Sequence, residues 1–185
     1  MQTQIYLIAP ADADPQSFAT ALQAALEQTP ASALLLPRGT RAENAYKQFC
    51  KAIIPIAQGA DCAVLVEGEP GLVRLLGADG LHVTGGIEAA QPAIAALRPA
   101  GLIVGVGEIG SRDEAMTLGE LEPDYLFFGT LEGRASAAQR DMAQWWAQTM
   151  EIPAVLGDPD ATEHETDAAG CEFIGLRVAV LETTR

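Results

Sequence analysis

Positive charge is scarce in this sequence of 185 residues, which has 11 lysines and arginines against 25 aspartates and glutamates. The net charge of −14 argues against a nucleic-acid partner, because an acidic surface repels the phosphates of nucleic acid. A small phosphorylated metabolite remains possible as a partner, since a few backbone amides and one arginine suffice to bind a phosphate locally. We therefore expect a small-molecule ligand and no nucleic acid.

Cysteine is also rare, and long apolar runs are missing. The three cysteines, Cys50, Cys62 and Cys171, are far apart and form no CxxC pair, which indicates reduced thiols. The opening MQTQIYLIAP has neither the basic segment nor the long apolar segment of a signal peptide. No apolar run approaches the roughly 20 residues that a membrane helix needs. The sequence predicts a cytoplasmic protein without a membrane partner.

The motifs of several enzyme classes are missing as well. The sequence contains no GxSxG nucleophile elbow, no Walker-type phosphate loop, and no histidine and cysteine cluster with the spacing of metal ligands. Candidate functional residues must therefore be found from their position in the predicted fold.

Short apolar segments recur along the whole chain. Each is too short for a helix and is bounded by Gly, Pro or Asp, and most are apolar throughout, as in strands covered on both faces. The predicted strands are IYLIA (5–9), SALLL (32–36), CAVLV (62–66), GLHV (80–83), LIVGV (102–106), YLFFG (125–129), PAVLG (153–157) and EFIGLR (172–177).

Helical patterns occupy many of the intervals between these strands. Asp14 and Pro15 form an N-cap and first helical position ahead of an apolar face that contains Phe18 and Leu22. The other predicted helices cover 42–57, a segment that begins with the capping box at Ser111 and Glu114, 136–150 and, more weakly, 161–169.

Eight strands, most of them followed by a helical segment, predict a compact (β/α)8 TIM barrel that forms one domain over residues 1–185. Few residues follow Arg177, so the last helix must be truncated. A doubly wound open sheet uses the same alternation and is the alternative fold.

In a barrel of this kind, ligands bind at the C-terminal ends of the strands. His82 lies at such an end, where it is either a packing residue or a proton donor or acceptor beside a ligand. Glu67 and Glu108 also follow strands and are candidates for a base or a metal ligand, although their spacing does not show that they meet. The other strand-end candidates are Pro10, Pro37, Arg38, Thr84, Gly107, Gly129, Thr130, Gly157, Asp158 and Arg177.

Several segments, taken in order, resemble the thiamine phosphate synthase family, which also includes the thiazole tautomerases. GADGLHVTGG resembles the fourth-strand signature G-A-D-G-V-H-L-G, IYLIAP the first strand, and PDYLFFG the sixth. LIVGVGEIGSRDEAM, WWAQTMEIPAVLGD and AGCEFIGLRVAV resemble the fifth, seventh and eighth strands with their neighbouring segments. The resemblance covers nearly the whole chain.

This resemblance implies a (β/α)8 barrel and a reaction of thiamine biosynthesis. Enzymes of the family join an aminopyrimidine diphosphate to a thiazole phosphate and release pyrophosphate, with Mg2+ bridging the diphosphate. By position, the resemblance implies substrate contacts at Tyr6, Arg38 and His82, and a metal ligand at Glu67. It implies phosphate contacts at Gly129, Thr130, Arg134, Gly157 and Arg177.

The sequence departs from the family pattern where the family binds phosphate. LLLPRG replaces the family's Q-x-R-x-K, which leaves Arg38 alone, and Glu67 stands where the family has Asn-Asp. TLEGRASA replaces a T-x-T-K loop and offers Arg134 instead of the lysine. Asp158 replaces the second of two glycines and is expected to repel a phosphate, whereas Arg177 replaces a serine and favours one.

Three interpretations follow. The first is a synthase in which arginines replace the missing phosphate contacts and Glu67 binds magnesium. The second is a relative that binds a small phosphorylated ligand, either as a tautomerase-like enzyme in which His82 moves a proton or as a regulator. The third is a catalytically silent barrel, a possible homodimer, whose acidic surface and one exposed tryptophan form an interface. The positions of Arg38, Arg177 and Asp158 relative to His82 distinguish them.

Overall fold

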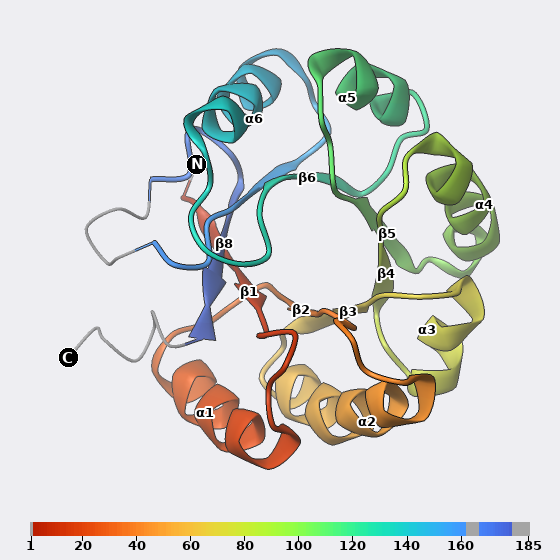
Figure 1. The fold of residues 1–185 in the computed structure, drawn as a ribbon, viewed down its shortest axis with the longest axis vertical. Coiled ribbons are helices and arrows are strands. Elements are labelled where there is room, and N and C mark those ends of the chain that lie inside the picture. Colours follow the sequence, from red (N-terminus) through yellow and green to blue (C-terminus); the bar gives the residue numbers. More distant parts are fainter. Residues whose placement is uncertain (1, 162–166, 179–185) are drawn as a thin grey trace.

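Eight parallel strands form a closed barrel in the computed structural model, which describes residues 2–161 and 167–178 (Figure 1). β1 pairs with both β2 and β8, and this pairing closes the ring. The predicted barrel is confirmed, and the alternative of an open sheet is wrong. The strands are β1 (Gln4–Ile8), β2 (Ala33–Leu36), β3 (Ala63–Val66), β4 (Gly80–Val83), β5 (Ile103–Val106), β6 (Tyr125–Gly129), β7 (Ala154–Gly157) and β8 (Phe173–Arg177).

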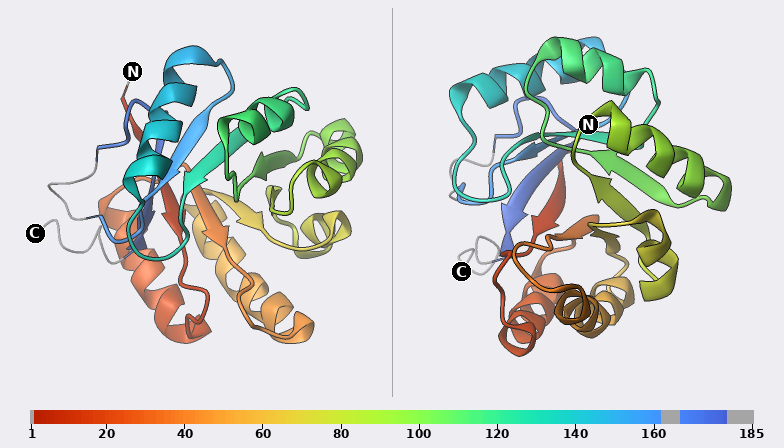
Figure 2. Two further views of the ribbon diagram at one scale, coloured as in Figure 1. Left: turned by 45° about the horizontal axis from the view of Figure 1, so that its top comes forward. Right: turned by 45° about the vertical axis from the view of Figure 1, so that its right-hand side comes forward.

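The helices lie outside the ring of strands, as Figures 1 and 2 show. Within the described residues they are α1 (Pro15–Gln28), α2 (Glu43–Gly59), α3 (Pro70–Leu76), α4 (Ile87–Leu97), the short 3-10 helix η1 (Arg98–Ala100), α5 (Arg112–Gly119) and α6 (Ala137–Thr149). None of them is long and apolar enough to span a membrane. The helix predicted over 161–169 and the truncated last helix fall largely outside the described residues.

Polar side chains fix the starts of the later helices. The Ser111 hydroxyl accepts a hydrogen bond from the Glu114 backbone N–H at 3.1 Å, while the Glu114 carboxylate accepts one from the Gly110 N–H at 2.8 Å. The reciprocal bond of the predicted capping box is therefore displaced by one residue. At the start of α6, Ser136 and Gln139 form the complete reciprocal pair.

Two apolar cores explain why the strands are apolar on both faces. The larger core lies between the strands and the helices, and it includes Trp146, which is buried. The neighbouring Trp145 is partly buried, and the Arg112 guanidinium lies over its ring at 4.8 Å from the ring centre. A smaller core fills the inside of the barrel and consists of Tyr6, Ile8, Leu35, Leu65, Tyr125, Phe127 and Val155.

The inner core requires a glycine on β5. A Cβ atom at Gly105 would lie 1.8 Å from Cζ of Tyr125, so the Tyr125 ring occupies the space that a side chain at this position would need. The two residues are also partners in the pairing of β5 with β6. The absence of a side chain at Gly105 thus allows a large aromatic ring to fill the barrel.

We expect Gly105→Ala to lower the free energy of unfolding by about 2–3 kcal/mol, because the added methyl group must displace the Tyr125 ring in a packed core. Chemical denaturation measures the change. Gly71→Ala is the matched control, since a Cβ at Gly71 in α3 meets nothing within 4 Å and alanine favours the helix by roughly 0.5–1 kcal/mol. Equal stabilities of the two variants would contradict this account of the core.

Candidate active site at the barrel mouth

Two adjacent cavities open at the C-terminal ends of the strands. The side cavity, of about 460 Å³, lies beside β4 and α4, and Arg38, Glu67, His82 and Thr84 are among the residues that line it. The central cavity, of about 340 Å³, lies over the barrel mouth and is lined by Ala11, Pro37, Gly39, Glu67, Thr84, Glu108, Leu131 and Glu132. Glu67 and Thr84 line both cavities, so the two form one polar region.

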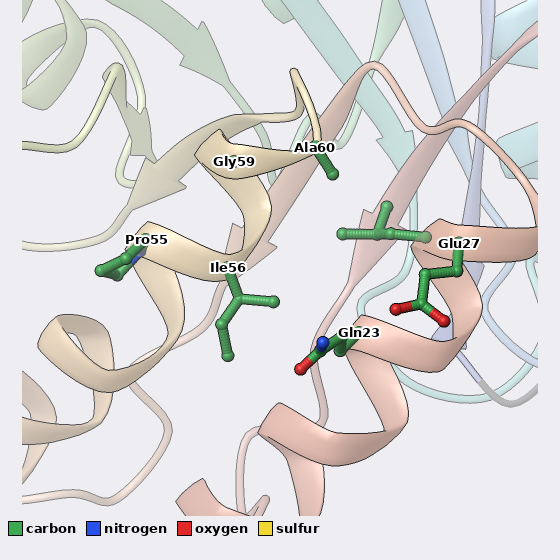
Figure 3. Close-up of a pocket in the computed structure, with 7 residues that line it drawn as sticks. Gln23, Glu27, Pro55, Ile56, Gly59 and Ala60 are labelled. Carbon is green, nitrogen blue, oxygen red and sulfur yellow. The ribbon is translucent and has the colours of Figure 1, made fainter.

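A third cavity, of about 380 Å³, lies between the C-terminal halves of α1 and α2 (Figure 3). Helices that follow parallel strands return toward the N-terminal ends of those strands, so this cavity is far from the mouth. Gln23, Glu27 and Ile56 are among the residues that line it, and none of its lining residues is a predicted site residue.

Glu67 and Glu108 face the same central cavity, although their spacing in the sequence did not show it. Burial raises the pKa of Glu67, and the negative charge of Glu108 raises it further, while the backbone N–H of Arg38 donates a hydrogen bond at 3.2 Å and opposes the change. Glu108 has a φ of 58°, in the left-handed region that residues other than glycine rarely adopt. The loop after β5 therefore holds this carboxylate at the mouth at some conformational cost.

Two arginines follow β2 and differ in their surroundings. Arg38 lines the side cavity together with Glu67 and His82, and its Nε donates to the backbone oxygen of Arg41 at 3.2 Å. Arg41, which the sequence did not single out, donates to backbone oxygens of the loop after β1, and its guanidinium lies 4.1 Å from the centre of the Phe49 ring. Arg41 thus anchors loops, whereas Arg38 faces the cavity.

His82 begins a buried chain of hydrogen bonds. Its Nδ1 lies 2.8 Å from the Tyr125 hydroxyl, which lies 2.9 Å from the Tyr6 hydroxyl. If Tyr6 donates to Tyr125 and Tyr125 donates to Nδ1, both buried hydroxyl protons are used; the reverse direction leaves the Tyr6 proton without a partner among the described residues. We infer that neutral His82 carries its proton on Nε2.

Burial also fixes the charge of His82, because it lowers the pKa of the imidazole to about 4. The ring is neutral at pH 7 and forms the floor of the side cavity. A Cβ at Gly107 would lie 2.7 Å from Nε2, so a glycine is needed beside this nitrogen. Tyr6, predicted as a substrate contact, lies inside the barrel and acts on the site through Tyr125 and His82.

We expect the His82 imidazole to titrate with a midpoint of about 4 and to be protonated on Nε2 at neutral pH. Nitrogen-15 NMR of labelled histidine measures both properties. Tyr125→Phe removes the donor to Nδ1 and should make the two neutral tautomers more equally populated. The unfolded chain in urea provides the control, with a midpoint near 6.5. A midpoint near 6.5 in the folded protein would contradict a buried, neutral His82.

On the opposite side of the mouth, a buried carboxylate binds Arg134, which the sequence predicted as a phosphate contact, and Arg140, which it did not. Asp158 is fully buried, its Oδ1 accepts hydrogen bonds from Arg134 Nε at 2.9 Å and from the Ala135 N–H at 2.8 Å, and its Oδ2 pairs with Arg140. Burial acts to raise the pKa of Asp158, but the bonds from Arg134, Ala135 and Arg140 outweigh it and lower the pKa. Arg134 is therefore engaged with Asp158.

The remaining phosphate candidates also contact the protein itself. Arg177 forms an ion pair with Asp160 at 2.7 Å, and the Thr130 hydroxyl donates to the backbone oxygen of Glu132 at 2.8 Å. Gly129 has a φ of 101°, and a Cβ there would lie 2.2 Å from the oxygen of Gly157, so these two glycines let β6 and β7 approach closely.

Backbone amides in this region donate to carbonyls. The Thr130 N–H donates to Gly157 at 3.0 Å, the Asp158 N–H to Gly175 at 2.9 Å, and the Arg177 N–H to Pro159 at 3.2 Å. These amides lie at the strand ends where barrels of this type often bind phosphate. In this chain the three amides donate to backbone carbonyl oxygens instead.

We expect Asp158→Asn to lower the free energy of unfolding by about 2–4 kcal/mol at pH 7, because it leaves two arginines without their buried partner. The pKa of Asp158 is lower in the folded chain than in the unfolded chain. Its stabilisation is thus complete above the ordinary aspartate pKa of about 4 and is lost as the pH falls through the lower folded value.

Urea denaturation between pH 7 and pH 3 tests this, and the difference between the two proteins should shrink below about pH 4. Asp160→Asn is the control, because the Asp160 side chain is 42% exposed and its ion pair with Arg177 should contribute less than about 1 kcal/mol. A difference that stays constant with pH would show that the Asp158 charge does not stabilise the fold.

The fold and the two cavities define a (β/α)8 barrel with its polar site at the C-terminal ends of the strands. The family model for thiamine monophosphate synthase matches residues 5–175. Thiamine-phosphate synthase of Rhodospirillum centenum is 32% identical over 94% of this chain and 86% of the relative. That of Hyphomonas neptunium is 31% identical over 97% and 86%. The chain belongs to the thiamine monophosphate synthase family.

Solved structures agree with this fold. Thiamine phosphate pyrophosphorylase from Pyrococcus furiosus superposes with a TM-score of 0.77 at 17% identity, covering 98% of this chain and 88% of that one. The YdjI aldolase from Escherichia coli K12 gives 0.69 at 14% identity over 95% and 74%. At these identities the likeness concerns the barrel architecture.

Proposed function

We propose that this chain catalyses the family reaction of thiamine biosynthesis in the cytoplasm, coupling an aminopyrimidine diphosphate to a thiazole. The single observation that carries the proposal is the convergence of Arg38, Glu67 and Glu108 on one polar region above a neutral His82. Family membership supports the reaction type.

The donor diphosphate is proposed to bind where Arg38 meets Glu67. Within the described residues, no group of three histidine, cysteine, aspartate or glutamate side chains is arranged to hold a metal ion. Glu67 and Glu108 nevertheless offer two oxygen donors at one cavity, and magnesium commonly binds through one or two carboxylates together with substrate phosphates. Magnesium bound there would neutralise charge on the diphosphate as it leaves.

The residues of the chain then have distinct roles. Arg38 contributes a fixed positive charge beside the diphosphate. His82 presents an Nε2–H that can donate a hydrogen bond to a nitrogen of the pyrimidine without adding charge, and Tyr125 keeps the imidazole in that tautomer. The bond between the pyrimidine methylene carbon and the diphosphate oxygen breaks, and the thiazole nitrogen forms a bond to the same carbon.

We expect purified protein with magnesium to form the coupled product when the donor is supplied with thiazole acceptors, both phosphorylated and unphosphorylated. Arg38→Ala, Glu67→Gln and Glu108→Gln should each lower kcat/KM by about 10- to 100-fold, the effect of losing one charge-assisted contact. Product formation followed by chromatography measures the rates.

Glu27→Gln is the control variant, because Glu27 lines the distant cavity between α1 and α2 and should leave the rates unchanged (Figure 3). The absence of product above a reaction without protein, with either acceptor, would overturn the proposed activity. In that case the chain would be better described as a binding or catalytically silent barrel.

A further inference from the structure

We infer that the thiazole accepted by this chain carries a free hydroxyl in place of a phosphate, and that Asp158 determines this specificity. The inference rests on the proposed function and concerns the second substrate. Within residues 2–161 and 167–178, no residue of β7, of β8 or of the loops that follow them lines either mouth cavity. These two cavities therefore lie over the ends of β1 to β6, and Asp158 lines neither of them.

Asp158 acts as an internal anion. Its carboxylate receives two guanidinium groups and one backbone N–H, which is the set of donors that a bound phosphate takes. Because the carboxylate belongs to the chain, it occupies a fixed position beside the two guanidinium groups at any ligand concentration. A phosphate that competed for Arg134 and Arg140 would have to displace a buried, covalently attached partner.

Further donors among the described residues of this side are also engaged. Arg177 pairs with Asp160, and the amides of Thr130, Asp158 and Arg177 donate to backbone oxygens. Binding a phosphate here would require breaking hydrogen bonds that help to order the ends of β6, β7 and β8. These donors are thus bonded to carboxylate and carbonyl oxygens of the chain, and a phosphate would have to replace those oxygens.

The charge of the remaining space disfavours a second phosphorylated substrate. Among the described residues that line the two mouth cavities, Arg38 is the only cation, whereas five are glutamates: Glu67, Glu69, Glu88, Glu108 and Glu132. The donor diphosphate already adds negative charge, and a phosphate monoester would add about two more charges. A hydroxyl adds none, and it can donate a hydrogen bond to a carboxylate such as Glu108 or Glu132.

The chemistry is the same with either acceptor. The donor's carbon–oxygen bond breaks and its electron pair leaves with pyrophosphate, while the lone pair of the thiazole nitrogen forms the new carbon–nitrogen bond. The hydroxyl of the acceptor takes no part in these steps. The product of the unphosphorylated acceptor is thiamine itself.

The test compares the two acceptors at saturating donor and magnesium. We expect kcat/KM for the unphosphorylated thiazole to exceed that for the thiazole phosphate by at least about tenfold, because the phosphate finds no charge-assisted contacts. A preference for the thiazole phosphate, or equal rates, would overturn the inference. A reaction with neither acceptor would overturn the proposed function instead.

Calorimetry distinguishes failure of the inference from failure of the proposed function, because it measures binding of each acceptor to the whole protein without turnover. Tighter binding of the unphosphorylated thiazole supports the inference even where no reaction occurs. Tighter binding of the thiazole phosphate, equal binding, or binding of neither one contradicts it.

Two variants test the role of Asp158. Asp158→Ala should shift the ratio of the two kcat/KM values toward the phosphate by at least about tenfold, because it releases Arg134 and Arg140. Where this variant fails to fold, Arg177→Ala tests whether this side of the mouth binds the phosphate of the acceptor, since Arg177 lies at the surface of the same region. We expect it to leave the ratio unchanged, whereas a tenfold loss confined to the phosphorylated acceptor would mean that Arg177 binds phosphate and that the inference is wrong.

Discussion

The inside of the barrel has to be filled, and the way in which Tyr125 fills it determines the floor of the site. Gly105 provides the space for the ring, and the Tyr125 hydroxyl connects Tyr6 to His82. This packing keeps the imidazole buried, neutral and fixed in one tautomer. In the sequence, His82 stands alone within a motif. In the structure it lies at the end of the barrel core that faces the mouth, and its tautomer depends on Tyr125 and Tyr6.

The mouth is divided by charge. On one side, Arg38 and several glutamates border open space, and on the other, Asp158 neutralises Arg134 and Arg140 inside the fold. The buried charge of the second half is the Asp158 carboxylate, which needs cationic partners. It finds them in the arginine after β6 and the arginine in α6, both of which stay partly exposed.

The sequence allowed the strands and the barrel to be predicted, because short, continuous apolar runs bounded by turn residues are typical of parallel strands covered on both faces. It did not lead to α3 and α4: α3 is short, and Pro92 within α4 is a residue that normally ends a helix. The strand-end rule identified Glu67, Glu108, His82 and Asp158, but their partners come from distant segments. Asp158 was expected to repel a phosphate, and its pairing with Arg134 and Arg140 could not be predicted because ion pairs between separate segments of the chain leave no periodic signal.

The departures from the family pattern are consistent with one another once the pairs are known. An aspartate introduced alone beside β7 would be a buried charge without a partner, at a cost that a domain of this size cannot easily bear. Together with Arg134 and Arg140 it becomes a closed ion cluster that stabilises the ends of β6 and β7. The same cluster removes the donors that a phosphate requires, so stability and ligand choice are linked through a single carboxylate. A chain that gains such a cluster can keep its donor site only if the cluster lies on the other side of the mouth, as it does here.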